Sequence, residues 1–242
     1  MYVIHAICRS ILAGSDQTGY CTCKIFRPYR FITAITFQER MLKLGTPPPV
    51  TTSLIVVNIL IFAYGTLSNS QNAIISHYGF VPNGLFKYDI FPDSVLRLFT
   101  SMFIHAGIAH IAFNLFALAY MGGFAERSVG KPKFIALYLL AGLGGALFHG
   151  VIASYVIGNG DSVLIGASGA ISGILGISAA LGDIRGYYWL AIQVLYVFIG
   201  SVTSLSIAFA AHVGGFIMGL ALTRVLVELE RRKRNPYRNF ST

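Results

Sequence analysis

The distribution of charged residues constrains this chain more than any other feature of its sequence. Five long stretches contain no Asp, Glu, Lys or Arg. A helix needs about 20 apolar residues to cross the hydrocarbon core of a membrane, and each stretch can hold at least one such helix. The sequence therefore predicts a membrane protein. The charge-free stretches are residues 44–86, 98–125, 134–160, 162–182 and 186–223.

The composition agrees with this prediction and excludes an ordinary soluble domain. Of the 242 residues, 55% are hydrophobic and 11% are charged, and the mean hydropathy is +0.68. We expect an all-α, polytopic membrane protein with six transmembrane helices, because the last charge-free stretch can hold two. The expected helices are residues 50–68, 105–125, 134–156, 163–182, 187–202 and 206–226.

The basic residues indicate how these helices are oriented. Six spans place both termini on the same side of the membrane, and of the 18 Lys and Arg residues only Lys87 and Arg97 then lie on the other side. Cytoplasmic segments carry the excess of Lys and Arg, so both termini are predicted to be cytoplasmic. The net charge of +9 is thus attributed to topology and to anionic lipid, and no nucleic-acid partner is expected.

The chain divides into three parts by composition. Residues 1–48 are predicted to be an N-terminal cytoplasmic tail, 49–227 the six-helix domain, and 228–242 a basic C-terminal cytoplasmic tail. Residues 1–40 are expected to be dispensable, either as a loose tail or as an extension upstream of a start at Met41. Because they are Arg-rich and acid-poor, an organelle-targeting segment is the alternative. The expected location is a prokaryotic cell membrane, with an organelle membrane as the alternative.

Four polar residues interrupt the apolar helices at similar depths. Ser168 is counted about five residues into its expected helix, roughly 8 Å deep by helical rise, and His212 lies at a similar level. His110 and Asn114 are four residues apart and share one helix face. Each has a structural alternative, since a serine can bond back to a carbonyl and His or Asn can join helices. Ionisable groups inside spans are nevertheless costly enough to be functional candidates.

Glycines on two of the helices provide a reason for Ser168 and His212 to meet. Small residues allow two helix backbones to approach closely, and that approach would bring the hydroxyl to the imidazole. Histidine can then take the serine proton and make it a nucleophile. The Asn114 amide, a His110 ring N–H and the Ser168 backbone N–H could stabilise the resulting oxyanion. No carboxylate is expected at this depth, so the arrangement would be a dyad. The glycines are Gly166, Gly169, Gly173 and Gly176 in one helix and Gly214, Gly215 and Gly219 in the other.

Three ordered motifs resemble the rhomboid family of intramembrane serine proteases. They are "HAGIAHIAFN" at residues 105–114, "GASGAISG" at 166–173 and "AHVGGFIMG" at 211–219, and the resemblance covers about residues 49–226. Each motif alone would be weak, but three in order on alternate helices are specific.

The resemblance implies a role for each of the four polar residues. Ser168 would be the catalytic nucleophile, His212 the catalytic general base and acid, and His110 and Asn114 the groups that stabilise the oxyanion. It implies no metal and no cofactor. Some family members carry an aromatic residue one turn after the serine, packed against the histidine, whereas this chain has Ser172. What fixes the ring of His212 is therefore left open by the sequence.

The expected function is that of an intramembrane serine endopeptidase acting through a Ser-His dyad. It would hydrolyse a peptide bond near the outer end of substrate transmembrane helices. The side entrance would be the helix at residues 187–200, with its outer end and the loop 69–93 as the movable parts. Its partners would be single-span membrane proteins and the lipid bilayer. Two alternatives remain: a catalytically silent rhomboid-like protein that binds membrane helices for quality control, and a channel or proton-linked transporter.

Overall fold

The computed structural model of this chain describes residues 47–88, 92–200 and 207–234. The regular structure in this part is helical, apart from an isolated antiparallel bridge between Phe80 and Leu164. The predicted all-α class is thereby confirmed. The expectations for the N-terminal tail up to residue 46, and for the C-terminal tail beyond residue 234, fall outside the described residues.

Four long apolar segments form the frame of the fold. Each is long and apolar enough to cross a membrane, so the chain is a multi-pass membrane protein. Two of these segments pass through π-helical turns, η2 and η3. The segments are α3 (Pro49–Leu67), α7 (Ile108–Ala117) with η2 (Leu118–Gly122) and α8 (Gly123–Val129), α9 (Lys131–Val151) with η3 (Ile152–Ile157), and α12 (Ile207–Arg234).

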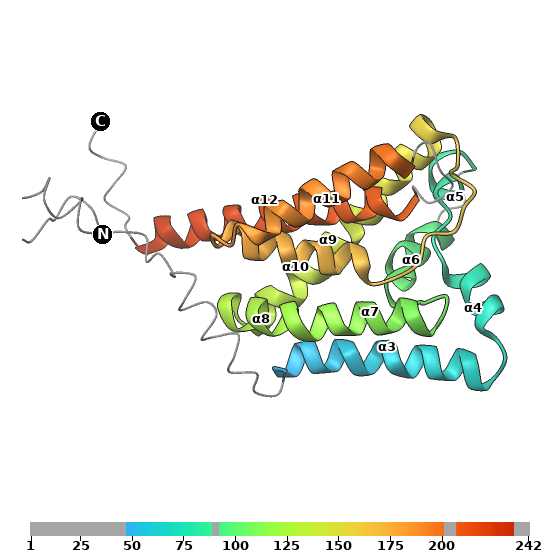
Figure 1. Cartoon of the computed structure of the whole chain (residues 1–242), viewed down its shortest axis with the longest axis horizontal. Coiled ribbons are helices and arrows are strands. Elements are labelled where there is room, and N and C mark those ends of the chain that lie inside the picture. Colours follow the sequence, from blue (N-terminus) through green and yellow to red (C-terminus); the bar gives the residue numbers. More distant parts are fainter. Residues whose placement is uncertain (1–46, 89–91, 201–206, 235–242) are drawn as a thin grey trace, which may run out of the picture. The chain divides into compact units, whose positions relative to one another are not determined.

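Two shorter helices are α10 (Ser168–Ala180) and α11 (Arg185–Gly200). α9, α10 and α12 pack together, and α11 lies along α12 (Figure 1). The sequence predicted each of these segments, but several of the predicted ends were wrong. α7 begins at Ile108 because Gly107 before it is extended. α12 continues to Arg234. In its last turns, Glu228 forms an ion pair of 3.0 Å with Arg232, which lies one turn later.

Short helices replace the predicted loop at residues 69–93. They are α4 (Gln71–Tyr78) and α5 (Pro82–Phe86), followed by α6 (Asp93–Thr100) and the turn η1 (Ser101–Phe103). The prediction that this segment is a loop was therefore wrong. Proline at the first position of α5 starts that helix without an unpaired N–H. This segment also buries Phe80 completely, so it is packed into the protein.

The helix that carries Ser168 begins later than the sequence predicted. Phe80 and Leu164 exchange two backbone hydrogen bonds of 3.0 and 2.7 Å, and the Gly166 N–H donates to the Ser101 carbonyl at 2.9 Å. Gly166 has a φ of +116°, a conformation that favours glycine. These contacts hold residues 163–167 outside the helix. Ser168 is consequently the first residue of α10, and the depth counted along five preceding helical residues was wrong.

The glycine contact between α10 and α12 is confirmed. A Cβ atom on Gly215 would lie 2.0 Å from the Gly169 carbonyl oxygen, and one on Gly219 would lie 2.2 Å from that of Gly173. The two backbones therefore meet where side chains would not fit. Gly214 differs from the prediction, since its Cβ position faces Phe148 of α9 at 2.5 Å.

A buried carboxylate ties α8 to the start of α3. Glu126 accepts hydrogen bonds from the backbone N–H groups of Val50 and Thr51, at 3.1 and 2.7 Å, and from the Thr51 hydroxyl at 2.8 Å. The first N–H groups of a helix have no intrahelical acceptor, and a negative charge there is favourable. Glu126 is 2% exposed, so it caps α3 from inside the protein.

Candidate active site

Ser168 stands at the N-terminus of α10, half-buried. The first N–H groups of a helix point out of its N-terminus without intrahelical acceptors. The first N–H group of α10 that has such an acceptor belongs to Ile171, which donates to the Ala167 carbonyl at 2.9 Å. The Ser168 hydroxyl is therefore placed beside backbone donors and at the positive end of the helix dipole.

His212 of α12 contacts this hydroxyl directly. His212 Nε2 lies 2.8 Å from Ser168 Oγ, a normal hydrogen-bond length. The glycine contact described above sets this distance, because Gly169 follows Ser168 and Gly215 lies one turn after His212. The structure thus brings together a hydroxyl and an imidazole from two helices.

The other ring nitrogen of His212 is held by α11. His212 Nδ1 lies 2.8 Å from Oε1 of Gln193, whose side chain is 3% exposed. An amide oxygen accepts and does not donate, so the hydrogen must be on Nδ1. In a neutral imidazole this leaves the Nε2 lone pair facing Ser168.

Two aromatic rings complete the surroundings of this imidazole. Trp189 of α11 lies with its ring centroid 6.4 Å from that of His212, and Phe209 of α12 lies 5.8 Å away in an edge-on arrangement. Ser172 is buried at 1% exposure. The contacts of the His212 ring therefore come from side chains of α11 and α12, and position 172 carries no aromatic residue.

His110 of α7 approaches the same place from the opposite side. The Ala106 N–H donates to His110 Nδ1 at 3.4 Å, so the remaining ring hydrogen is on Nε2. A Cβ atom on Gly166 would lie 2.7 Å from His110 Nε2 and 3.7 Å from Ser168 Oγ. Gly166 therefore leaves open the space that the two side chains share.

Asn114 supports this part of the site from one turn further along α7. Its Nδ2 donates to the His110 carbonyl at 2.8 Å, and its side chain is 6% exposed. An amide nitrogen carries two hydrogens, so one remains after this bond. The ring of His105 packs edge-on against His110 at 5.0 Å and steadies it further.

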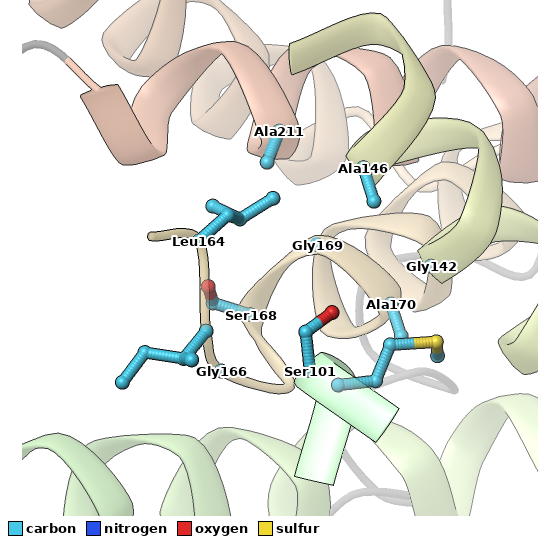
Figure 2. Close-up of a pocket in the computed structure, with 11 residues that line it drawn as sticks. Ser101, Gly142, Ala146, Leu164, Gly166, Ser168, Gly169, Ala170 and Ala211 are labelled. Atoms are coloured by element: carbon cyan, nitrogen blue, oxygen red, sulfur yellow. The ribbon is translucent and has the colours of Figure 1, made fainter. Parts of the chain in front are cut away.

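A pocket opens beside Ser168. Figure 2 shows Ser168 and Ser101 lining it with small residues from three helices, Gly142 and Ala146 of α9, Ala170 of α10 and Ala211 of α12. In the described part of the chain, no three His, Cys, Asp or Glu side chains gather as a metal site would require. The pocket thus provides space at the hydroxyl without a candidate metal centre there.

The residue that sequence reasoning missed is Gln193. Residues 187–200 are otherwise apolar or aromatic, and none of the three motifs includes them. The available signal was the single side-chain amide in this helix, since such a group commonly forms interhelical hydrogen bonds in membranes. The four predicted residues, in contrast, all lie in this one region of the structure.

Comparison with known proteins agrees with the motifs. The family model of the Rhomboid domain matches residues 92–229, more than half of the chain. The chain is 32% identical over 208 residues to Rhomboid protease GluP of Bacillus subtilis, covering 78% of this chain and 38% of that protein. It is 27% identical over 230 residues to Rhomboid protease GlpG of Salmonella choleraesuis, covering 92% of this chain and 76% of that protein.

Coverage is lower for Rhomboid protease AarA of Providencia stuartii. The match is 32% identical over 147 residues, covering 53% of this chain and 49% of that protein. The chain thus spans half or less of the length of AarA and GluP. The family model covers the three motifs that hold Ser168, His212 and His110. The chain therefore belongs to the rhomboid family.

Proposed function

We propose that this protein is an intramembrane serine endopeptidase that acts through a dyad of Ser168 and His212. The observation that carries the proposal is the 2.8 Å contact between Ser168 Oγ and His212 Nε2 at the N-terminus of α10. Activation of a serine requires a base within hydrogen-bond reach, and imidazole suits this role near neutral pH.

The reaction proceeds in two halves. Ser168 Oγ attacks the carbonyl carbon of the substrate peptide bond while its proton passes to His212 Nε2. The carbon–nitrogen bond then breaks, and His212 returns that proton to the departing amine, leaving an ester on Ser168. Water then attacks this ester while His212 accepts a proton from the water. The ester bond breaks, the substrate leaves with a new carboxyl end, and His212 returns the proton to Ser168 Oγ.

The oxyanion formed in each half needs donors that are already in place. The backbone N–H of Ser168 points out of the helix terminus, and His110 Nε2–H and the second Asn114 N–H are the side-chain candidates. The positive end of α10 adds to this stabilisation. Of these donors, His110 is best supported, because Gly166 leaves open the space between it and Ser168.

Substrates are proposed to be transmembrane helices of single-span proteins. In a helix the peptide bonds are shielded by their own hydrogen bonds, and water is scarce in hydrocarbon, so the bond must be unwound before attack. We place the cleaved bond near the outer end of the substrate helix, with Gly or Pro in that helix promoting cleavage because they weaken it. We further propose that the protein has six transmembrane spans, that both termini are cytoplasmic, and that it lies in a prokaryotic cell membrane.

The substrate would enter beside α11. The inner end of α11 is attached to its neighbours, since a Cβ on Gly186 would lie 2.8 Å from the Leu175 carbonyl, and Arg224 donates to the Tyr187 hydroxyl at 2.8 Å. Bulky apolar side chains follow, and several face outward, including Tyr188 and Leu195. A helix held at one end can tilt at the other, which would open the site to the bilayer.

A serine-directed fluorophosphonate tests the proposal on purified protein in detergent. We expect covalent labelling of the wild type at Ser168, identified by mass spectrometry, and loss of labelling in Ser168→Ala. Ser172→Ala, one turn away and buried, is the matched control and should label normally. Equal labelling of wild type and Ser168→Ala would overturn the dyad and favour a silent helix-binding protein or a transporter.

A second measurement identifies substrates. Membrane proteins that remain uncut in cells expressing Ser168→Ala, but are cut with the wild type, are candidates. Mapping the cut ends should place them near the outer ends of single spans, at or beside small residues. Cuts confined to water-exposed domains would contradict the intramembrane assignment.

A further inference from the structure

We propose that Gln193 of α11 is a positioning residue that sets the tautomer and orientation of His212. The inference rests on the proposed function, because it assigns how the proposed base is held. It concerns a helix that carries none of the three sequence motifs.

The geometry that carries the proposal is a continuous line of hydrogen bonds through the imidazole. Gln193 Oε1, His212 and Ser168 Oγ are joined by two contacts of 2.8 Å each, one at either ring nitrogen. An imidazole that donates from Nδ1 has an unprotonated Nε2, which can accept the proton of the Ser168 hydroxyl. In the opposite tautomer Nε2–H would point at Ser168, and the ring could not act as the base.

Gln193 occupies the place that the acid holds in a Ser-His-Asp triad. An amide oxygen fixes the ring and its tautomer as a carboxylate does, but it brings no negative charge into the membrane. An uncompensated carboxylate at that depth would be costly, whereas a buried amide needs only its hydrogen bonds. Gln193 is 3% exposed, so water does not compete for the Nδ1 hydrogen there.

This bond also crosses between two helices. Gln193 lies on α11 and His212 on α12, and Trp189, one turn before Gln193, adds a ring contact at 6.4 Å. The other described polar contact from α11 to α12 joins Tyr187 and Arg224, toward the opposite end. The orientation of His212 therefore depends on where α11 sits.

Three variants separate positioning from packing. Gln193→Leu keeps a similar volume but removes the acceptor, and Gln193→Glu restores an acceptor oxygen. Leu60→Ala changes an exposed side chain of α3, 61% accessible, and is the control. Thermal unfolding checks that each variant is folded. If Gln193→Leu does not fold, Gln193→Met takes its place as a more flexible side chain without an amide acceptor.

The first readout does not depend on activity. Nitrogen NMR of protein labelled with ¹⁵N-histidine, with the His212 signal identified by its loss in His212→Ala, reports which ring nitrogen carries the hydrogen. We expect Nδ1–H in the wild type and in Gln193→Glu, and a mixture of tautomers in Gln193→Leu. A wild-type His212 protonated at Nε2 would overturn the proposal, as would Nδ1–H unchanged in Gln193→Leu.

The second readout is the rate of labelling by a small fluorophosphonate, measured beside kcat and KM on a transmembrane substrate. We expect Gln193→Leu to lower both the labelling rate and kcat on the order of 10-fold to 100-fold, as for other groups that orient an imidazole, with little change in KM. Gln193→Glu should recover much of the loss, and Leu60→Ala should show none. A change in KM alone, with normal labelling, would assign Gln193 to packing and overturn the proposal.

The two proposals can fail separately. If Ser168 is not the labelled residue, the proposed function fails, while the tautomer measurement still decides whether Gln193 orients the ring. If Ser168 is labelled and Gln193→Leu behaves as the wild type in both readouts, the dyad stands and the role of Gln193 is rejected.

Discussion

Ser168 Oγ and His212 Nε2 lie 2.8 Å apart although 44 positions separate them in the chain. Two glycine pairs make this possible, because Gly169 with Gly215 and Gly173 with Gly219 let the backbones of α10 and α12 touch. The hydroxyl and the imidazole are thus held by helix packing, and neither depends on a flexible loop for its position.

The two residues should behave as one unit. We expect Ser168→Ala and His212→Ala each to abolish cleavage of a transmembrane substrate while the protein stays folded. The double variant should be no less active than either single one, because either loss removes the activated nucleophile. Cleavage rates of the three purified variants, with unfolding temperatures, test this prediction. Additive losses would show that the residues act independently.

The second prediction concerns the oxyanion donors. Asn114→Ala should lower the cleavage rate on the order of 10²-fold, as for loss of a single oxyanion donor elsewhere. The control is Asn58→Ala on α3, since Asn58 Nδ2 donates to the Leu54 carbonyl at 2.7 Å, the same local bond that Asn114 makes to His110. If both variants lose stability but keep their rate, Asn114 serves its own helix and not the reaction.

Close packing of α10 and α12 leads to the third prediction. Gly215→Ala should lower the free energy of unfolding by about 1–3 kcal/mol, the usual cost of overpacking, because its Cβ would lie 2.0 Å from the Gly169 carbonyl. Activity should fall with it, since Ser168 precedes Gly169. Gly107→Ala is the control, because Gly107 is extended and no atom lies within 4 Å of the added Cβ. Equal stability of the two variants in chemical or thermal unfolding would contradict the prediction.

The fourth prediction concerns the cap of α3. Glu126→Ala should cost about 2 kcal/mol or more of stability, because three donors lose a charged acceptor. Glu228→Gln removes an exposed carboxylate that pairs with Arg232, and exposed pairs contribute little. Thermal unfolding of both variants in micelles compares the two sites. If Glu228→Gln lost as much stability as Glu126→Ala, the prediction that the buried cap contributes more than the exposed ion pair would be contradicted.

The sequence by itself determined the class of protein and predicted the residues of its candidate site. Charge-free stretches set the long helices, because a charge inside hydrocarbon is costly wherever it occurs in the chain. The family motifs pointed to Ser168, His212, His110 and Asn114, and glycine spacing predicted the contact of α10 with α12. These inferences rest on local patterns, which hold before any tertiary contact is known.

Tertiary structure decided where the helix of Ser168 begins. Residues 163–167 are apolar and uncharged, so hydropathy cannot distinguish them from the helix that follows. Backbone bonds from Phe80 to Leu164 and from Gly166 to Ser101 keep them extended or turned. Phe80 and Ser101 are both distant from these residues in sequence. Their hydrogen bonds place Ser168 at a helix terminus, where the first N–H groups have no intrahelical acceptor.

The partner of His212 was likewise decided only in three dimensions. Gln193 belongs to a helix without a motif, and a single amide in an apolar segment does not reveal which neighbour it faces. That depends on the rotation of α11 against α12, which is set by side-chain packing along both helices. The sequence determined which groups could carry the chemistry, whereas the packing of α10, α11 and α12 determined which of their atoms meet.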